Sequence, residues 1–108
     1  MPDIDALIQS WQTGDERAAE TLFNQFREQV YRLAYGLLGE PAEAEEAAQD
    51  ALSYALLNIR RFDPARASFT TWLYTITVSR CRNRYRRRRL RAFRLRISPF
   101  SGKFSARD

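Results

Sequence analysis

An all-α fold, a small bundle of about four helices, is predicted by two features of this 108-residue sequence. Apolar residues recur at the 3.6-residue helical period over successive stretches. Residues typical of helix ends, among them Gly39, Pro41 and Ser68, stand between those stretches. At this length we expect one domain, with residues 1–89 forming the helical unit and residues 90–108 a basic linker or tail whose order the sequence leaves open.

The first two predicted helices occupy the N-terminal third of the chain. The apolar face of the first is Ile4, Leu7, Ile8 and Trp11. This helix is expected to end near Thr13-Gly14, where Thr13 and Glu16 have the spacing of a capping box for the next helix. The apolar face of the second is Ala19, Leu22, Phe23, Phe26, Val30, Leu33, Ala34 and Leu37. Gly39 suits the left-handed position that closes a helix.

A third and a fourth helix follow. Pro41 fits the first turn of the third helix. The apolar face of this helix is Ala44, Ala47, Ala48, Ala51, Leu52, Ala55, Leu56 and Ile59. Pro64 then enforces a loop, because it moves Asp63 out of helical geometry, and Ser68 is placed to cap the fourth helix.

The fourth helix is expected to turn Phe69, Trp72, Leu73 and Ile76 toward the core, with Tyr74, Val78, Cys81 and Tyr85 on a neighbouring stripe. After Arg89 the pattern is ambiguous. Leu90, Phe93 and Ile97 fit a helical face, whereas Phe93, Leu95 and Ile97 alternate with arginines as in a strand.

Charge is strongly divided along the chain, whose net charge is +5. Residues 1–60 hold four arginines and eleven carboxylates, a net charge of −7, and residues 61–108 have a net charge of +12. Ten arginines fall between Arg80 and Arg96. Because a guanidinium binds phosphate through a planar fork of donors, this density predicts a polyanion as partner. The acidic half predicts a second partner of opposite sign, unless it balances the basic half within the fold.

Composition argues against several function classes. Histidine is absent and Cys81 is the single cysteine, so we expect no zinc site and no intrachain disulfide. Because no glycine-rich phosphate loop occurs either, we expect a binding protein rather than an enzyme, without a cofactor. No apolar run approaches 18 residues, and the acidic N-terminus is unlike a signal peptide. We therefore expect a cytoplasmic protein that is not inserted in a membrane.

Four sequence blocks stand in the order and at the spacing of a known family. They are Ala44-Glu45-Glu46-Ala47-Ala48-Gln49-Asp50-Ala51-Leu52, Arg61-Phe62-Asp63-Pro64, Ser68-Phe69-Thr70-Thr71-Trp72-Leu73-Tyr74-Thr75-Ile76 and the arginine run that follows. Together they resemble region 2 of the extracytoplasmic-function sigma factors, over roughly residues 12–89. Region 4, the helix-turn-helix of that family, has no counterpart, so we expect either an excised domain or a protein that lacks this module.

This resemblance implies a transcription initiation factor that docks on the clamp helices of the largest subunit of core RNA polymerase. It also implies that the domain recognises the −10 promoter element, helps to melt it and holds its nontemplate strand. An anti-sigma protein is a further implied partner. The polymerase-binding residues implied in this way are Glu46, Gln49 and Asp50, with Leu52 and Leu56 as apolar neighbours.

The DNA-binding residues that the resemblance implies belong to the loop before the fourth helix and to that helix. They are Phe62, Asp63, Ser68, Trp72, Ser79, Arg80, Asn83, Arg84, Arg87 and Arg88. The loop at residues 62–68 resembles the one that receives an unstacked base, and Trp72 occupies the aromatic position near the upstream edge of melted DNA. Ser79 and Asn83 replace an Asn and an Asp of the family pattern, which bears on base preference.

The residues favour single-stranded nucleic acid independently of the resemblance. Aromatic side chains interleave with arginines in this segment, and each base stacked on such a ring contributes about 1–3 kcal/mol. Two alternatives stay open. One is a generic basic helical nucleic-acid-binding protein without a polymerase partner, and the other is a module whose basic helix lies on anionic lipid. By spacing alone, Trp72 is more simply explained as a core residue.

Overall fold

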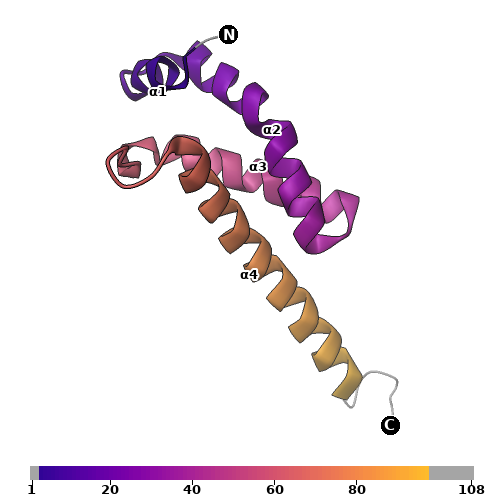
Figure 1. The fold of residues 1–108 in the computed structure, drawn as a ribbon. Coiled ribbons are helices and arrows are strands. Elements are labelled where there is room, and N and C mark those ends of the chain that lie inside the picture. Colours follow the sequence, from indigo (N-terminus) through magenta and orange to yellow (C-terminus); the bar gives the residue numbers. More distant parts are fainter. Residues whose placement is uncertain (1–2, 98–108) are drawn as a thin grey trace.

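The computed structural model describes residues 3–97, which form four α-helices and one short 3₁₀ helix. In chain order these are α1 (Ile4–Gln12), α2 (Glu16–Leu38), α3 (Pro41–Leu57), η1 (Ile59–Arg61) and α4 (Phe69–Ile97). No strand occurs among residues 3–97, so the predicted all-α fold is confirmed. Helix α2 packs against α1, α3 and α4, and α3 also packs against α4 (Figure 1).

Three of the predicted helix ends are confirmed. Gly39 follows α2 with φ +72°, the left-handed conformation that a glycine adopts without steric cost. Pro41 opens α3, where its missing N–H is not needed for a helical hydrogen bond. The hydroxyl oxygen of Ser68 accepts a hydrogen bond of 3.1 Å from the backbone N–H of Thr71 and so caps α4.

The start of α2 differs from the predicted one. Asp15 is the N-cap, because its carboxylate accepts a hydrogen bond of 3.0 Å from the N–H of Arg17. Thr13 instead closes α1, and its hydroxyl donates to the carbonyl of Ser10 at 2.8 Å. Gly14 has φ +101°, which places the chain reversal between the two helices at this residue. The predicted capping box at Thr13 is therefore wrong.

The core lies where α2, α3 and the N-terminal half of α4 meet. Every residue of the predicted apolar face of α3, with Ile59 of η1, is buried, and its alanines allow the neighbouring helices to approach closely. On α2 the buried residues are Ala18, Leu22, Phe26, Val30, Ala34 and Leu38. Leu37, which was predicted to face the core, is 44% exposed.

The buried stripe of α4 differs from the predicted one. It consists of Phe69, Leu73, Thr77 and Cys81, each four residues after the last. Trp72 and Ile76 are only half-buried, and Tyr85 is 45% exposed. A polarity pattern does not identify Thr77 as a core residue, but its hydroxyl donates to the carbonyl of Leu73 at 2.8 Å, which satisfies it inside the core.

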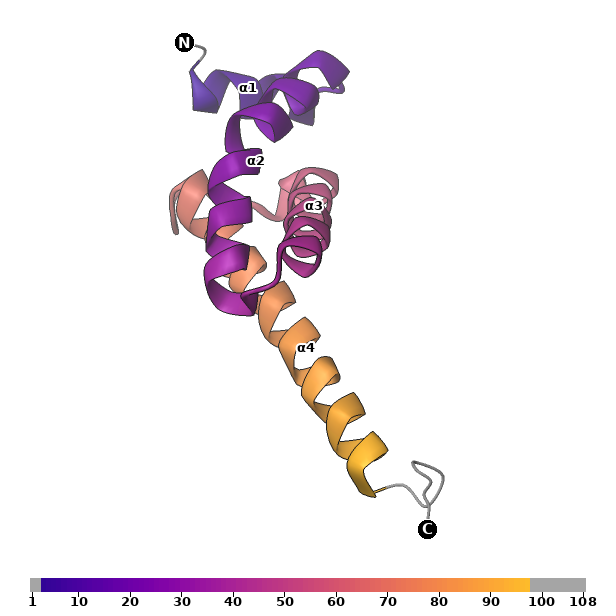
Figure 2. The ribbon, with the colours of Figure 1, turned by 90° about the vertical axis from the view of Figure 1, so that its right-hand side faces the viewer.

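Beyond the bundle, α4 continues as an isolated helix (Figures 1 and 2). Residues 90–97 are helical, which decides between the two patterns open after Arg89. The described part is 60 Å long and has a radius of gyration of 18.4 Å, against about 13 Å for a compact domain of 100 residues. Residues 98–108 of the predicted tail lie outside the described residues. None of the helices in residues 3–97 is both long and apolar enough to cross a membrane.

Candidate functional site

Helix α3 buries its alanine face and turns its opposite side to solvent. We call this exposed side the α3 ridge, and it consists of Glu45, Glu46, Gln49, Asp50, Ser53 and Leu57. These residues follow one another at steps that keep them on one side of a helix. The ridge ends in Leu57, whose side chain is 77% exposed and which is the most exposed large apolar residue of the described part. A carboxylate row ending in an exposed leucine is a suitable surface for a partner with basic and apolar groups.

The predicted polymerase-binding residues lie in two layers. Glu46, Gln49 and Asp50 are on the α3 ridge, whereas Leu52 and Leu56 are buried beneath it with exposed fractions of 1% and 7%. Sequence reasoning missed Leu57. The signal was available, because Leu57 follows Ser53 by four residues and Asp50 by seven, on the same side of the helix.

Ion pairs join α3 to α4 along a line that we call the α3–α4 seam. Arg80 lies 3.3 Å from a carboxylate oxygen of Asp50, and Arg84 lies 3.1 Å from Glu46 and 3.8 Å from Glu43. The guanidinium of Arg80 also stacks over the ring of Tyr54 at 4.5 Å. Two residues predicted to bind polymerase therefore contact two residues predicted to bind DNA. To this extent the acidic half does balance the basic half within the fold.

A groove between α2 and α4 lies on another side of α4. It is lined by Leu33, Thr71, Tyr74, Thr75, Val78, Ser79, Arg82, Asn83 and Arg86. Ser79 and Asn83 are exposed here, as a DNA-reading role requires. Sequence reasoning missed Arg82 and Arg86, although their positions three and seven residues after Ser79 place them on the same helical side.

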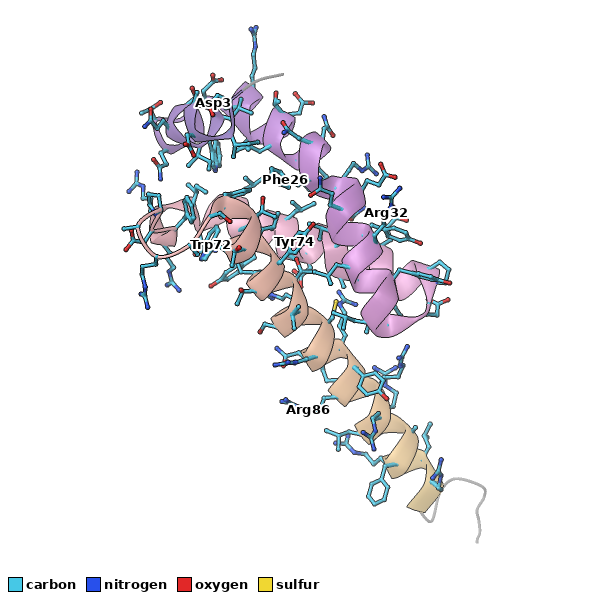
Figure 3. The ribbon with its side chains drawn as sticks, viewed as in Figure 1. Asp3, Phe26, Arg32, Trp72, Tyr74 and Arg86 are labelled. Atoms are coloured by element: carbon cyan, nitrogen blue, oxygen red, sulfur yellow. The ribbon has the colours of Figure 1, made fainter. Side chains whose placement is uncertain are left out.

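The α2–α4 groove is cationic. Within residues 3–97, neither Arg82 nor Arg86 has a carboxylate oxygen within 4 Å, in contrast to the arginines of the seam. Figure 3 shows Arg86 on the C-terminal half of α4 and Tyr74 near the α2 side of the helix. The Tyr74 hydroxyl donates to Gln29 of α2 at 3.2 Å and so links the two helices that form the groove. Its arginines are available to an anionic ligand.

Arg87 and Arg88, also predicted to bind phosphate, differ in their surroundings. Arg88 donates to the carbonyl of Leu38 at 3.3 Å, where α2 ends, and is half-buried. A positive charge at this position interacts favourably with the negative, C-terminal end of the α2 dipole. Arg87 is exposed. Arg88 thus links α4 to the end of α2, whereas the Arg87 side chain is exposed to solvent.

The loop at residues 62–68 is braced against the core. Phe62 is only 8% exposed, and its ring packs against Phe69 and Trp72 at centroid distances of 5.7 and 5.3 Å. The Asp63 carboxylate accepts a hydrogen bond of 3.0 Å from the N–H of Ala65, which fixes the turn. Trp72 is half-buried at the start of α4, beside this loop (Figure 3). Trp72 packs against the core cluster but is only partly buried by it.

Cys81 belongs to the core rather than to a reactive site. Burial raises the pKa of its thiol, and the nearby Arg84 guanidinium opposes that rise. The thiolate is the nucleophilic form of cysteine, so a raised pKa keeps the side chain in the unreactive thiol form at neutral pH.

Comparison with known proteins decides the family. The family model for Sigma-70 region 2 matches residues 22–91, which include the α3 ridge, the seam, the α2–α4 groove and the loop. The chain belongs to the sigma-70 region 2 family. The resemblance to extracytoplasmic-function sigma factors, predicted from four sequence blocks, is confirmed by relatives that carry this name.

Three curated relatives show the extent of the similarity. The chain is 35% identical over 86 residues to the ECF RNA polymerase sigma factor SigW of Bacillus subtilis, which covers 80% of this chain and 46% of SigW. It is 31% identical over 84 residues to SigK of Mycolicibacterium vanbaalenii, covering 78% and 43%. It is 36% identical over 66 residues to RpoE of Cereibacter sphaeroides, covering 61% and 36%. The chain spans less than half the length of these relatives.

Proposed function

We propose that this sigma region 2 domain acts in transcription initiation, with the α3 ridge on core RNA polymerase and the α2–α4 groove on promoter DNA. One observation carries the proposal. Two adjacent helices present surfaces of opposite charge in different directions, acidic with an exposed leucine on α3 and cationic with polar residues on α4. Family membership supports polymerase as one partner, since the relatives are named as RNA polymerase sigma factors, and the cationic groove supports DNA as the other.

The α3 ridge docks on the clamp helices of the largest polymerase subunit. Glu46 and Asp50 contribute charge although they are paired in the seam, because a carboxylate has several acceptor positions and their side chains are 70% and 45% exposed. Gln49 contributes hydrogen bonds, and Leu57 contributes apolar area. Leu52 and Leu56 support the ridge from below rather than touching polymerase.

The α2–α4 groove and the neighbouring loop bind the −10 element and help to melt it. Arg82 and Arg86 neutralise backbone phosphate, and Ser79 and Asn83 offer polar groups to bases. The loop at residues 62–68 receives an unstacked base of the nontemplate strand, and the exposed part of Trp72 stacks at the upstream edge. Phe62, Asp63 and Ser68 hold the loop in shape, and an anti-sigma protein that covers these surfaces would inhibit the domain.

A second candidate function is a basic nucleic-acid-binding protein without a polymerase partner. The seam favours it, because carboxylates that pair with arginines inside the fold need no further partner. The two functions differ in what the α3 ridge does. Only the first makes association with polymerase depend on ridge residues.

Charge reversal on the α3 ridge tests the proposal. Glu46→Lys combined with Asp50→Lys is expected to abolish co-purification with core RNA polymerase, whereas Glu16→Lys with Glu20→Lys at the exposed start of α2 leaves it intact. Because the ridge variant also breaks the seam, Arg80→Gln with Arg84→Gln serves as a second control: it breaks the same ion pairs but keeps the carboxylates, and is expected to retain polymerase. Full retention by the folded ridge variant would favour the second function.

A further inference from the structure

Five arginines form a single row along α4. They are Arg80, Arg84, Arg87, Arg91 and Arg94. Their steps of four, three, four and three residues keep them on one side of an α-helix, since the side chains advance by about 100° per residue. The row starts where α4 packs on α3 and continues along the part of the helix that Figure 2 shows projecting from the bundle.

The proximal part of the arginine row is engaged within the protein. Arg80 is held between the carboxylate of Asp50 and the ring of Tyr54. Arg84 pairs with Glu46, and its side chain is only 21% exposed. A phosphate group would have to share either guanidinium with these carboxylates. The two proximal arginines therefore fix α4 to α3.

The distal part of the arginine row has different surroundings. Arg87, Arg91 and Arg94 are exposed, and within residues 3–97 none of them has a carboxylate oxygen within 4 Å. Arg87 and Arg91 border the same hollow as Glu43 and Glu46 without pairing with them, and Arg94 lies beyond that hollow. The Arg88 contact with Leu38 marks the end of α2, past which α4 projects.

We propose that the distal arginine row, Arg87, Arg91 and Arg94, is a binding site for the phosphodiester backbone of duplex DNA. At 1.5 Å of rise per residue the three arginines span about 10 Å, and a DNA strand carries one phosphate per 3.4 Å of axis, so the row is as long as about three phosphate-to-phosphate steps. The arginine fork suits phosphate geometry. This contact is separate from the groove that we assign to the melted strand.

The absence of rings on this side of the helix favours a duplex over a single strand. Sites for single strands combine cationic grooves with aromatic platforms. Tyr85 and Phe93 lie on the opposite side of α4 from the distal row, where they border a hollow with Leu37 and Leu90. The distal row thus offers charge for a backbone without a surface on which unpaired bases would stack.

Two double variants, one on each side of α4, test this site. Arg91→Gln with Arg94→Gln removes two charges from the row, and Arg89→Gln with Arg96→Gln removes two from the opposite side, roughly 180° round the helix. Glutamine retains a high helix propensity. The affinity of the full chain for a 20-base-pair duplex without a promoter sequence is measured by fluorescence anisotropy over a range of NaCl concentrations.

The row variant is expected to lose about eightfold in duplex affinity at 0.1 M salt for each lost phosphate contact. The slope of log affinity against log salt concentration should also become less steep by about 0.9 per contact. The opposite-side control should lose much less. Equal losses in the two variants would overturn the site, as would unchanged duplex affinity of the row variant. Loss of binding to anionic phospholipid vesicles with duplex affinity unchanged would likewise overturn it, in favour of a membrane surface.

The inference extends the proposed function but fails separately from it, because the duplex assay contains no polymerase and no unpaired DNA. A chain that binds duplex through the row and ignores polymerase would contradict the proposed function and support this site. A row variant that retains duplex affinity would contradict this site, and binding of the wild-type chain to polymerase would still support the proposed function. Circular dichroism of both variants confirms that α4 remains helical.

Discussion

Arg84 of α4 and Glu46 of α3 form an ion pair of 3.1 Å that joins two helices to which we assign different partners. The pair is asymmetric, since the side chain of Arg84 is 21% exposed and that of Glu46 is 70% exposed. Glu46 therefore keeps most of its surface for a second partner, whereas Arg84 does not. This asymmetry explains why we assign the ridge to polymerase and give phosphate binding to other arginines of α4.

A double-mutant cycle on Arg84→Gln and Glu46→Gln is expected to give a coupling energy of about 0.5–1 kcal/mol in urea unfolding, since the arginine is largely shielded from solvent. The Arg32–Glu28 pair is the matched control. Both of its side chains are more than 70% exposed, so we expect a coupling below about 0.5 kcal/mol. A larger coupling in the exposed pair would contradict the role of the seam.

Leu57→Ser is expected to weaken binding to core RNA polymerase about tenfold or more, because burial of a leucine in an interface removes apolar area worth about 1.5–3 kcal/mol from water. Leu37→Ser is the control, since Leu37 is also exposed but lies on α2. Titration of labelled polymerase with each variant measures the effect. Equal affinities of the two variants would remove Leu57 from the docking surface.

Trp72→Leu should reduce affinity for an unpaired nontemplate oligonucleotide while leaving duplex affinity unchanged. Leucine retains apolar contact with Phe62 and Phe69 but lacks the face on which a base stacks, a contact of about 1–3 kcal/mol. Trp11→Leu, which removes an indole that donates to the carbonyl of Leu56, controls for loss of packing alone. Parallel losses on unpaired and duplex DNA for Trp72→Leu would mean that the ring is purely structural.

The raised pKa of Cys81 predicts a stability loss in alkaline solution. The unfolded thiol ionises near pH 8.5, whereas the buried thiol stays protonated to higher pH. The stability from Cys81 is therefore complete below about pH 8.5 and declines as the pH rises toward the folded pKa. Urea unfolding from pH 7 to 10 should show a steeper decline for the wild-type chain than for Cys81→Ala. Identical pH profiles would contradict the pKa direction.

The sequence predicted the helices and most of the core because those depend on local periodicity and on single residues such as Gly39 and Pro41. It was wrong at Thr13, because the glycine after it takes the turn and leaves Asp15 as the cap. It also assigned Leu56 to the polymerase-facing surface, although the helical period places Leu57 there, four residues after Ser53 and seven after Asp50.

The seam was beyond prediction for a different reason. Arg80 and Asp50 are 30 residues apart, and their pairing depends on how α3 crosses α4. The same dependence holds for the groove. The sequence shows which residues share a side of α4 with Ser79, but not that Leu33 of α2 lies against that side. Composition could therefore indicate a nucleic-acid partner. Only the structure shows which arginines of α4 contact other helices and which are exposed without a carboxylate partner.

The central claim is that the ridge of α3 holds core RNA polymerase while the groove of α4 holds a separated promoter strand. It is tested most directly by the affinity of the complex of this chain with core RNA polymerase for one −10 oligonucleotide, presented unpaired and then in duplex. We predict a complex that binds the unpaired nontemplate strand at least about tenfold more tightly. No complex with polymerase, or equal affinity for the two forms of DNA, would contradict the claim.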